Sequence, residues 1–186
     1  TMDKQQANTG KSTQSPPGAL QAILYSRETG LQLLDQRLLP FQQTYLPVPT
    51  VRDAWQQIRD MVVRGAPAIG VAGALALAVH VYAGGALGKQ YASAQAASDE
   101  VRDTMAYLAT SRPTAVNLAD SAARLARVAA AAAARAGATA ESVAAAVVAD
   151  AEATLPEDVA ANRAIGAHGA RALLDAVGAR KGGERG

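Results

Sequence analysis

The sequence contains no cysteine, which excludes a disulfide framework, a thiolate metal site and a cysteine nucleophile supplied by these 186 residues. Aromatic residues are scarce too, at 4% of the chain, although hydrophobic residues reach 49%. Alanine makes the difference, because it fills 46 positions. We therefore expect a core of small side chains in a chain that has the size of one ordinary domain.

Neither sign of charge dominates. The sequence has 18 lysines and arginines and 16 acidic residues, and its net charge is +2. This balance does not indicate the concentrated basic stripe that binds nucleic acid. The longest apolar run, 66–83, is interrupted by proline, glycine and histidine, and it falls short of the roughly 20 residues of a membrane span. We expect it to form a buried helix, and neither nucleic acid nor a membrane to be a partner.

The chain divides by composition. Residues 1–18 are rich in glutamine, serine, threonine, glycine and proline and lack an apolar signal core, so they are expected to form a disordered tail. Residues 19–178 carry the periodic apolar pattern of one folded domain. The glycine-rich stretch 179–186 is expected to be a linker to a further domain.

The first part of that domain has the pattern of a small sheet. Short apolar runs flank Thr29 and Gly30, which favours a hairpin turn. Prolines at 40, 47 and 49 keep the next extended segment at a sheet edge. We expect a small N-terminal antiparallel sheet of two or three strands.

Helical periodicity begins after this sheet, and it predicts a helical bundle, so the fold class is mainly α with a small β start (α+β). Gly70 and Gly73 offer surfaces where another helix could approach closely. The expected helices run from a Thr50 cap to near Gly65, from Pro67 to about Tyr82, over 94–109, from a Thr114 cap to about Ala136, and from a Thr139 cap onward, with a kink or division at Pro156.

One candidate binding motif consists of Arg64, Gly65 and Ala66, directly before Pro67. A helix start leaves backbone N–H groups free, and the helix dipole makes that end attractive to an anion. An arginine can grip a phosphate through two parallel hydrogen bonds, and a glycine lets the backbone approach the oxygens. These residues thus predict a phosphate cradle, although Arg64 could equally cap the preceding helix and Gly65 could simply end it.

A second motif of the same kind centres on Arg112, just before the helix start expected at Thr114. Pro113 holds Arg112 in an extended conformation there. The two arginines could converge on one anion. The alternative is an exposed arginine in an ordinary connecting turn.

Other polar groups are interpreted structurally. His80 and His168 lack nearby carboxylate partners in the sequence, so we expect no metal site. Glu157 and Asp158 follow Pro156 as the charged first turn of a helix would. Three arginines form a basic edge that is interpreted as a solvated helix face: Arg124, Arg127 and Arg135.

Five separated segments resemble, in order and spacing, the N-terminal half of the methylthioribose-1-phosphate isomerases, a group that shares its superfamily with regulatory subunits of the exchange factor for translation initiation. The segments are 20–30 (LQAILYSRETG), 31–40 (LQLLDQRLLP), 61–71 (MVVRGAPAIGV), 110–118 (TSRPTAVNL) and 162–170 (NRAIGAHGA). The resemblance spans about residues 19–178.

The resemblance implies an aldose–ketose isomerase of methionine salvage, which converts 5-methylthioribose 1-phosphate into 5-methylthioribulose 1-phosphate without a cofactor. It implies substrate binding by Arg64, Gly65, Ala66 and Arg112. It also implies a cytoplasmic, and in eukaryotes also nuclear, homodimer, with the site between this domain and a Rossmann-like C-terminal domain.

The essential cysteine and aspartate of that family belong to the C-terminal domain, and no residue of this sequence matches them. We therefore expect no catalytic residue here and no activity from the 186 residues alone. Three alternatives remain open: a regulatory subunit of the translation-initiation exchange factor, a ribose-1,5-bisphosphate isomerase, and an alanine-rich interaction module without a ligand.

Overall fold

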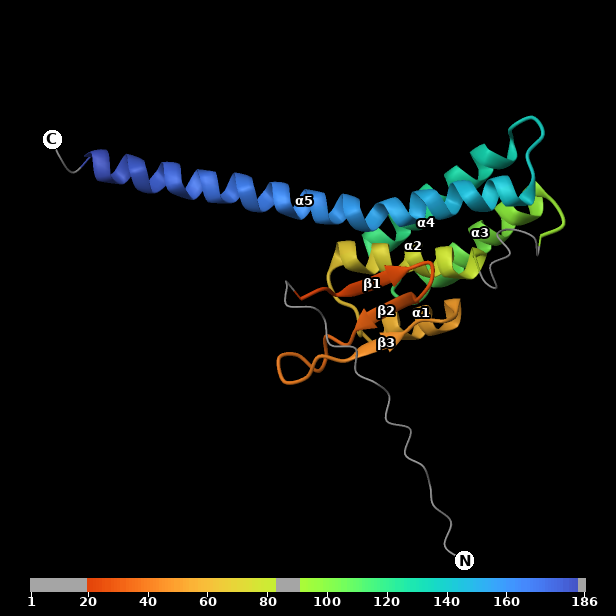
Figure 1. Cartoon of the computed structure of the whole chain (residues 1–186), viewed down its shortest axis with the longest axis horizontal. Helices are drawn as coiled ribbons and strands as arrows, with labels where there is room; N and C mark the ends of the chain where they lie inside the picture. Colours follow the sequence, from red (N-terminus) through yellow and green to blue (C-terminus); the bar gives the residue numbers. More distant parts are fainter. Residues whose placement is uncertain (1–19, 83–90, 184–186) are drawn as a thin grey trace, which may run out of the picture.

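A computed structural model describes residues 20–82 and 91–183. Within these residues, a small sheet and four helices pack around a central helix, the second in the chain (Figure 1). The mainly helical fold class with an N-terminal antiparallel sheet is confirmed. The expected disordered tail, 1–18, and the glycines at 84, 85 and 88 lie outside the described residues.

Three antiparallel strands form the sheet, in the order β1 (Ile23–Ser26), β2 (Gly30–Leu34) and β3 (Tyr45–Pro47). The hairpin between β1 and β2 turns where the sequence predicts it, because Gly30 takes a φ of 73° that side chains disfavour. The proline-flanked strand β3 pairs with β2 at one end of the strand order and is an edge strand.

Helix α1 (Val51–Arg59) begins as predicted, with the Thr50 hydroxyl accepting a hydrogen bond from the Asp53 N–H at 3.2 Å. Its predicted end near Gly65 is wrong. The helix ends at Arg59 because Met61 adopts a left-handed φ of 59°, and the chain then needs the turn 60–65 to reach the next helix.

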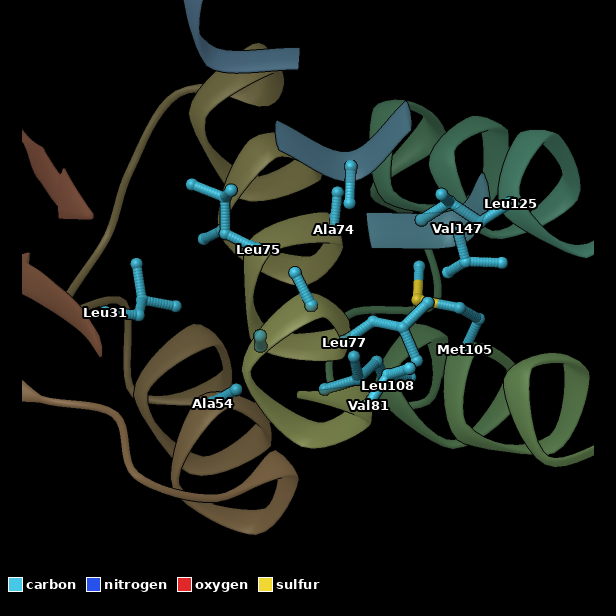
Figure 2. Packing of buried hydrophobic residues seen from close by; sticks show 14 of the residues in the cluster. Leu31, Ala54, Ala74, Leu75, Leu77, Val81, Met105, Leu108, Leu125 and Val147 are labelled. Atoms are coloured by element: carbon cyan, nitrogen blue, oxygen red, sulfur yellow. The ribbon is translucent and has the colours of Figure 1, made fainter. Parts of the chain in front are cut away.

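Helix α2 (Ala66–Val81) is the centre of the domain, as its apolar sequence predicts. Eleven of its 16 residues are buried, and it contacts the other four helices as well as β1 and β2. Figure 2 shows Leu75 and Leu77 of α2 among side chains from the sheet and the surrounding helices. The small residues let these neighbours approach α2 closely.

Helix α3 spans Ala94–Ala109, the predicted range, and Ser93 caps it. Helix α4 spans Val116–Ala133, three residues short of the predicted end near Ala136. The predicted Thr114 cap is also wrong, because Ala115 occupies the cap position and no side chain caps the helix.

Helix α5 (Ala140–Gly183) begins with the predicted Thr139 cap, whose hydroxyl accepts the Ser142 N–H at 3.2 Å. Of the expected kink or division at Pro156, the division is wrong, since one helix continues through the proline (Figure 1). Glu157 and Asp158 are therefore mid-helix residues rather than a first turn. The helix also covers most of the expected linker, 179–186, whose role between domains remains a prediction.

Candidate functional site

The N-terminal halves of α2 and α4 lie side by side. A Cβ built on Gly70 of α2 would stand 2.8 Å from the Asn117 carbonyl oxygen of α4 and 2.9 Å from the Ser121 hydroxyl, and one on Gly73 would stand 2.5 Å from Leu118. These distances leave no room for a side chain. The expectation that another helix approaches α2 at its glycines is thus confirmed.

These two helix starts differ from those of α1, α3 and α5. Threonine or serine hydroxyls cap α1, α3 and α5, but α2 and α4 have no side-chain cap and no acidic residue in the first turn. Their first turns therefore have no side-chain acceptor at the positive ends of the two helix dipoles. Two adjacent uncapped N-termini form a surface suited to an anion.

Arg64 and Gly65 stand at the start of α2. Gly65 is the cap residue of that helix, with a φ of 95°, and the space beside its Cα is open. The Arg64 side chain is exposed, and its Nε donates to the Met61 carbonyl at 3.2 Å. Met61 lies in the turn after α1, so this bond is not the expected capping of that helix's carbonyls. It occupies one of the five guanidinium donors.

Arg112 stands in the turn that leads into α4. Its carbonyl accepts the Ala115 N–H at 2.9 Å, and its side chain is half-buried. Within the described parts of the chain, neither Arg64 nor Arg112 forms an ion pair. Both guanidinium charges therefore lack a carboxylate partner there.

The helices that precede the two arginine turns contact each other. The Trp55 indole N–H of α1 donates to the Thr110 hydroxyl at 2.8 Å, and the Trp55 ring stacks on Tyr107 of α3 at 5.9 Å. The middle of α1 thereby contacts the end of α3, while Gly70 and Asn117 join the helices that come next in the chain. The turns 60–65 and 110–115 thus each connect one helix of the first pair to one helix of the second.

A buried carboxylate lies near Arg64 but is already engaged. Asp35 receives two hydrogen bonds from the Arg37 guanidinium, at 2.8 and 2.7 Å. These bonds hold the pKa of Asp35 below its ordinary value against the effect of burial, and the charge of Arg64 adds a smaller contribution. Arg37 thus neutralises Asp35 and leaves Arg64 available to a ligand.

A groove of about 460 Å³ opens beside the two helix starts, between α2, α4 and α5. Pro67 and Asn117 belong both to its wall and to the first turns of α2 and α4, and Gly70 lines the groove one turn further along α2. Arg64 and Arg112 are not among its lining residues. The groove therefore adjoins the candidate anion site without containing it.

Two of the polar residues that were expected to have only structural roles have partners that the sequence does not indicate. His80 does have a carboxylate partner, Glu100, at 3.0 Å. Arg124 is not simply a solvated residue, because it pairs with Asp150 and Glu157 of α5. These partners lie 26 and 33 residues away along the chain, a separation at which no local pattern signals a contact.

Within residues 20–82 and 91–183, no group of three histidine or acidic side chains is arranged to hold a metal ion. No helix in the same residues has the length and apolar character needed to cross a membrane.

Comparison with known proteins places these features in a family. The model of the initiation factor 2 subunit family matches residues 62–178, which include both arginine motifs. A curated barley protein (Hordeum vulgare) named methylthioribose-1-phosphate isomerase is 47% identical over 163 residues, 88% of this chain and 43% of its own length. The chain thus spans about two fifths of that relative.

Two solved structures share the fold. The 5-methylthioribose 1-phosphate isomerase from Pyrococcus horikoshii superposes with a TM-score of 0.70 at 27% identity, covering 81% of this chain and 40% of the archaeal one. The translation initiation factor eIF-2B subunit delta from A. fulgidus has a TM-score of 0.61 at 29% identity, covering 76% and 38%.

Proposed function

The chain belongs to the initiation factor 2 subunit family, and we propose that it is the substrate-phosphate-binding part of a sugar-phosphate aldose–ketose isomerase. The substrate is 5-methylthioribose 1-phosphate and the product is 5-methylthioribulose 1-phosphate, a step of methionine salvage. The relatives that bear an isomerase name support this assignment at 47% identity.

The adjacent uncapped N-termini of α2 and α4 carry the proposal. A phosphate dianion at this surface accepts hydrogen bonds from first-turn N–H groups of both helices, and Gly65 lets the backbone approach its oxygens. Arg64 and Arg112 add charge-assisted hydrogen bonds, which are shorter and stronger than neutral ones.

Phosphate binding contributes position rather than bond rearrangement. Holding the phosphate on C1 fixes the neighbouring C1–C2 bond, across which a hydrogen moves during isomerisation, and so removes much of the entropic cost of reaching the reactive geometry. We assign the acid–base groups to the remaining length of the protein. The chain of 186 residues alone is therefore inactive, and this domain supplies no catalytic residue.

The remaining length also provides the partner surface. Five large apolar side chains of α5 beyond Pro156 are exposed, and they suit contact with a further part of the protein. They are Val159, Ile165, Leu173, Leu174 and Val177. We propose that a Rossmann-like C-terminal domain contacts this part of α5, that the whole enzyme is a cytoplasmic homodimer, and that it needs no cofactor.

The main alternative is a regulatory, non-enzymatic subunit of the translation-initiation exchange factor, which the fold of the A. fulgidus protein supports. The barley isomerase is 47% identical over 88% of this chain, and the solved isomerase has the higher TM-score of the two structures, 0.70 against 0.61, which favours the enzyme. Titration of the full-length protein with 5-methylthioribose 1-phosphate decides between them, because a regulatory subunit has no need to bind this sugar.

Kinetics of the full-length protein test the proposal. Arg64→Ala and Arg112→Ala should each lower kcat/KM by about 10- to 100-fold, which corresponds to charged hydrogen bonds of about 1.5–3 kcal/mol. Arg52→Ala removes an exposed arginine of α1 and serves as the matched control. Unchanged kcat/KM for both site variants would exclude the phosphate role and favour an interaction module without a ligand.

A further inference from the structure

Helix α5 passes from a buried half to an exposed half at Pro156. Val147, Val148 and Ala151 are fully buried, whereas residues 159–177 are exposed throughout. Pro156 lacks an N–H and cannot donate to the carbonyl of Glu152, so the helix loses a hydrogen bond where it leaves the domain. Figure 1 shows the exposed half projecting away from the other elements.

Arg124 of α4 spans this weak point. Its Nε and Nη2 donate to the Asp150 carboxylate at 2.8 and 3.0 Å, and its Nη1 donates to Glu157 at 3.0 Å. Asp150 precedes Pro156 and Glu157 follows it. Their separation of seven residues places both carboxylates on one face of α5, where a single guanidinium reaches both.

Contacts on the opposite face of α5 also bind the helix just before Pro156. Glu152 accepts two hydrogen bonds from Arg27, both at 2.7 Å, and one from the Tyr25 hydroxyl at 2.8 Å. The β1–β2 hairpin therefore holds α5 before Pro156, but only Arg124 is seen to bind on both sides of the proline within the described residues.

We propose that Arg124 is a positioning residue that fixes the direction in which the exposed half of α5 leaves the domain. Its contacts to Asp150 and Glu157 replace the restraint that Pro156 removes from the helix. Whatever contacts the exposed half of α5 is thereby held in a defined place relative to the starts of α2 and α4. This inference does not depend on phosphate binding.

Spin-label distance measurements test the proposal directly, because the sequence has no cysteine that would compete for the label. Cysteines replace Gln56 on α1 and His168 on the exposed half of α5, both exposed positions. The doubly labelled 186-residue chain should give one narrow distance distribution. Arg124→Gln should roughly double its width, because helices bend most readily at proline.

Three further variants separate positioning from general stability. Arg127→Gln changes another arginine of α4. Like Arg124, Arg127 lines the groove between α2, α4 and α5, and its replacement should leave the distance distribution narrow. Adding Pro156→Ala to Arg124→Gln restores the helix hydrogen bond and should narrow the distribution again. Arg124→Lys should rescue only in part, because an ammonium group does not provide the planar fork of donors.

The result that overturns the proposal is an unchanged width in a folded Arg124→Gln variant, with folding checked by circular dichroism. A double variant with Pro156→Ala that stays broad overturns it as well. If Arg124→Gln does not fold, Glu157→Gln decides, since it weakens the contact beyond Pro156 and keeps Asp150 in place. Broadening by Glu157→Gln supports the proposal, and an unchanged width contradicts it.

Discussion

Gly70 of α2 lies against the main-chain carbonyl of Asn117 of α4, so close that a Cβ at residue 70 would stand 2.8 Å from that oxygen. The contact brings two helix N-termini together without an intervening side chain. Because neither helix has a side-chain cap, the proposed phosphate can accept hydrogen bonds from backbone donors of both. The glycine thus links core packing to the proposed site.

Gly70→Ala should destabilise the domain by about 1–3 kcal/mol, because the added methyl group forces apart a backbone contact in a packed core. Urea unfolding followed by circular dichroism measures the loss. Gly166→Ala is the matched control, since that helical glycine has nothing within 4 Å. At residue 166 the same change should stabilise the domain by about 0.5–1 kcal/mol. Equal effects at the two positions would show that the α2–α4 contact is not as close as described.

Gly65→Ala should weaken both folding and phosphate binding. The φ of 95° at residue 65 costs a side chain about 1–2 kcal/mol, and relaxation of that backbone turns the first N–H groups of α2 away from the ligand. Gly137→Ala introduces comparable strain, at a φ of 71°, between α4 and α5. It should lower stability in the same way and leave phosphate affinity unchanged. Loss of affinity in both variants would indicate a general effect of destabilisation.

Acid should remove the contribution of Glu152 to stability. Hydrogen bonds from Arg27 and Tyr25 lower the pKa of Glu152 in the folded state, against the effect of burial. Such a group stabilises the fold above its ordinary pKa, near 4.5, and loses that effect as the pH falls through the lower folded-state pKa. Glu152→Gln should therefore be less stable than the parent at pH 7.

The stability difference between Glu152→Gln and the parent should shrink as the pH falls below about 4.5. Thermal unfolding between pH 3 and pH 7 measures this difference. The control is Glu28→Gln, which changes an exposed acidic residue of the hairpin. A difference that stays constant over this range would contradict the assigned role of the carboxylate.

Local signals in the sequence predict much of the fold. The hairpin at Gly30, the Thr50 and Thr139 caps and the bounds of α3 depend on neighbouring residues, and the structure has them where the pattern places them. The end of α1 was not predictable in this way. It depends on the left-handed conformation of Met61, a residue type that gives no turn signal.

Long-range packing determines the features that local patterns do not reveal. α5 continues through Pro156 while ion pairs from Arg124, at a distance of 26 and 33 residues along the chain, hold it on both sides. For the site, each arginine motif was predicted from its own neighbours, and the convergence of Arg64 and Arg112 on one anion stays a prediction. The contact between Gly70 and Asn117, which brings the two helices together, is one that no local pattern specifies.

The most direct test of the account is a titration of the ¹⁵N-labelled chain with inorganic phosphate, followed by amide chemical shifts. A shared phosphate site predicts saturable amide chemical-shift changes that cluster at the first turns of both α2 and α4. These changes should be lost in the Arg64→Ala, Arg112→Ala double variant. Shifts at only one of these helix starts, or saturable shifts that persist in the double variant, would contradict a shared phosphate site.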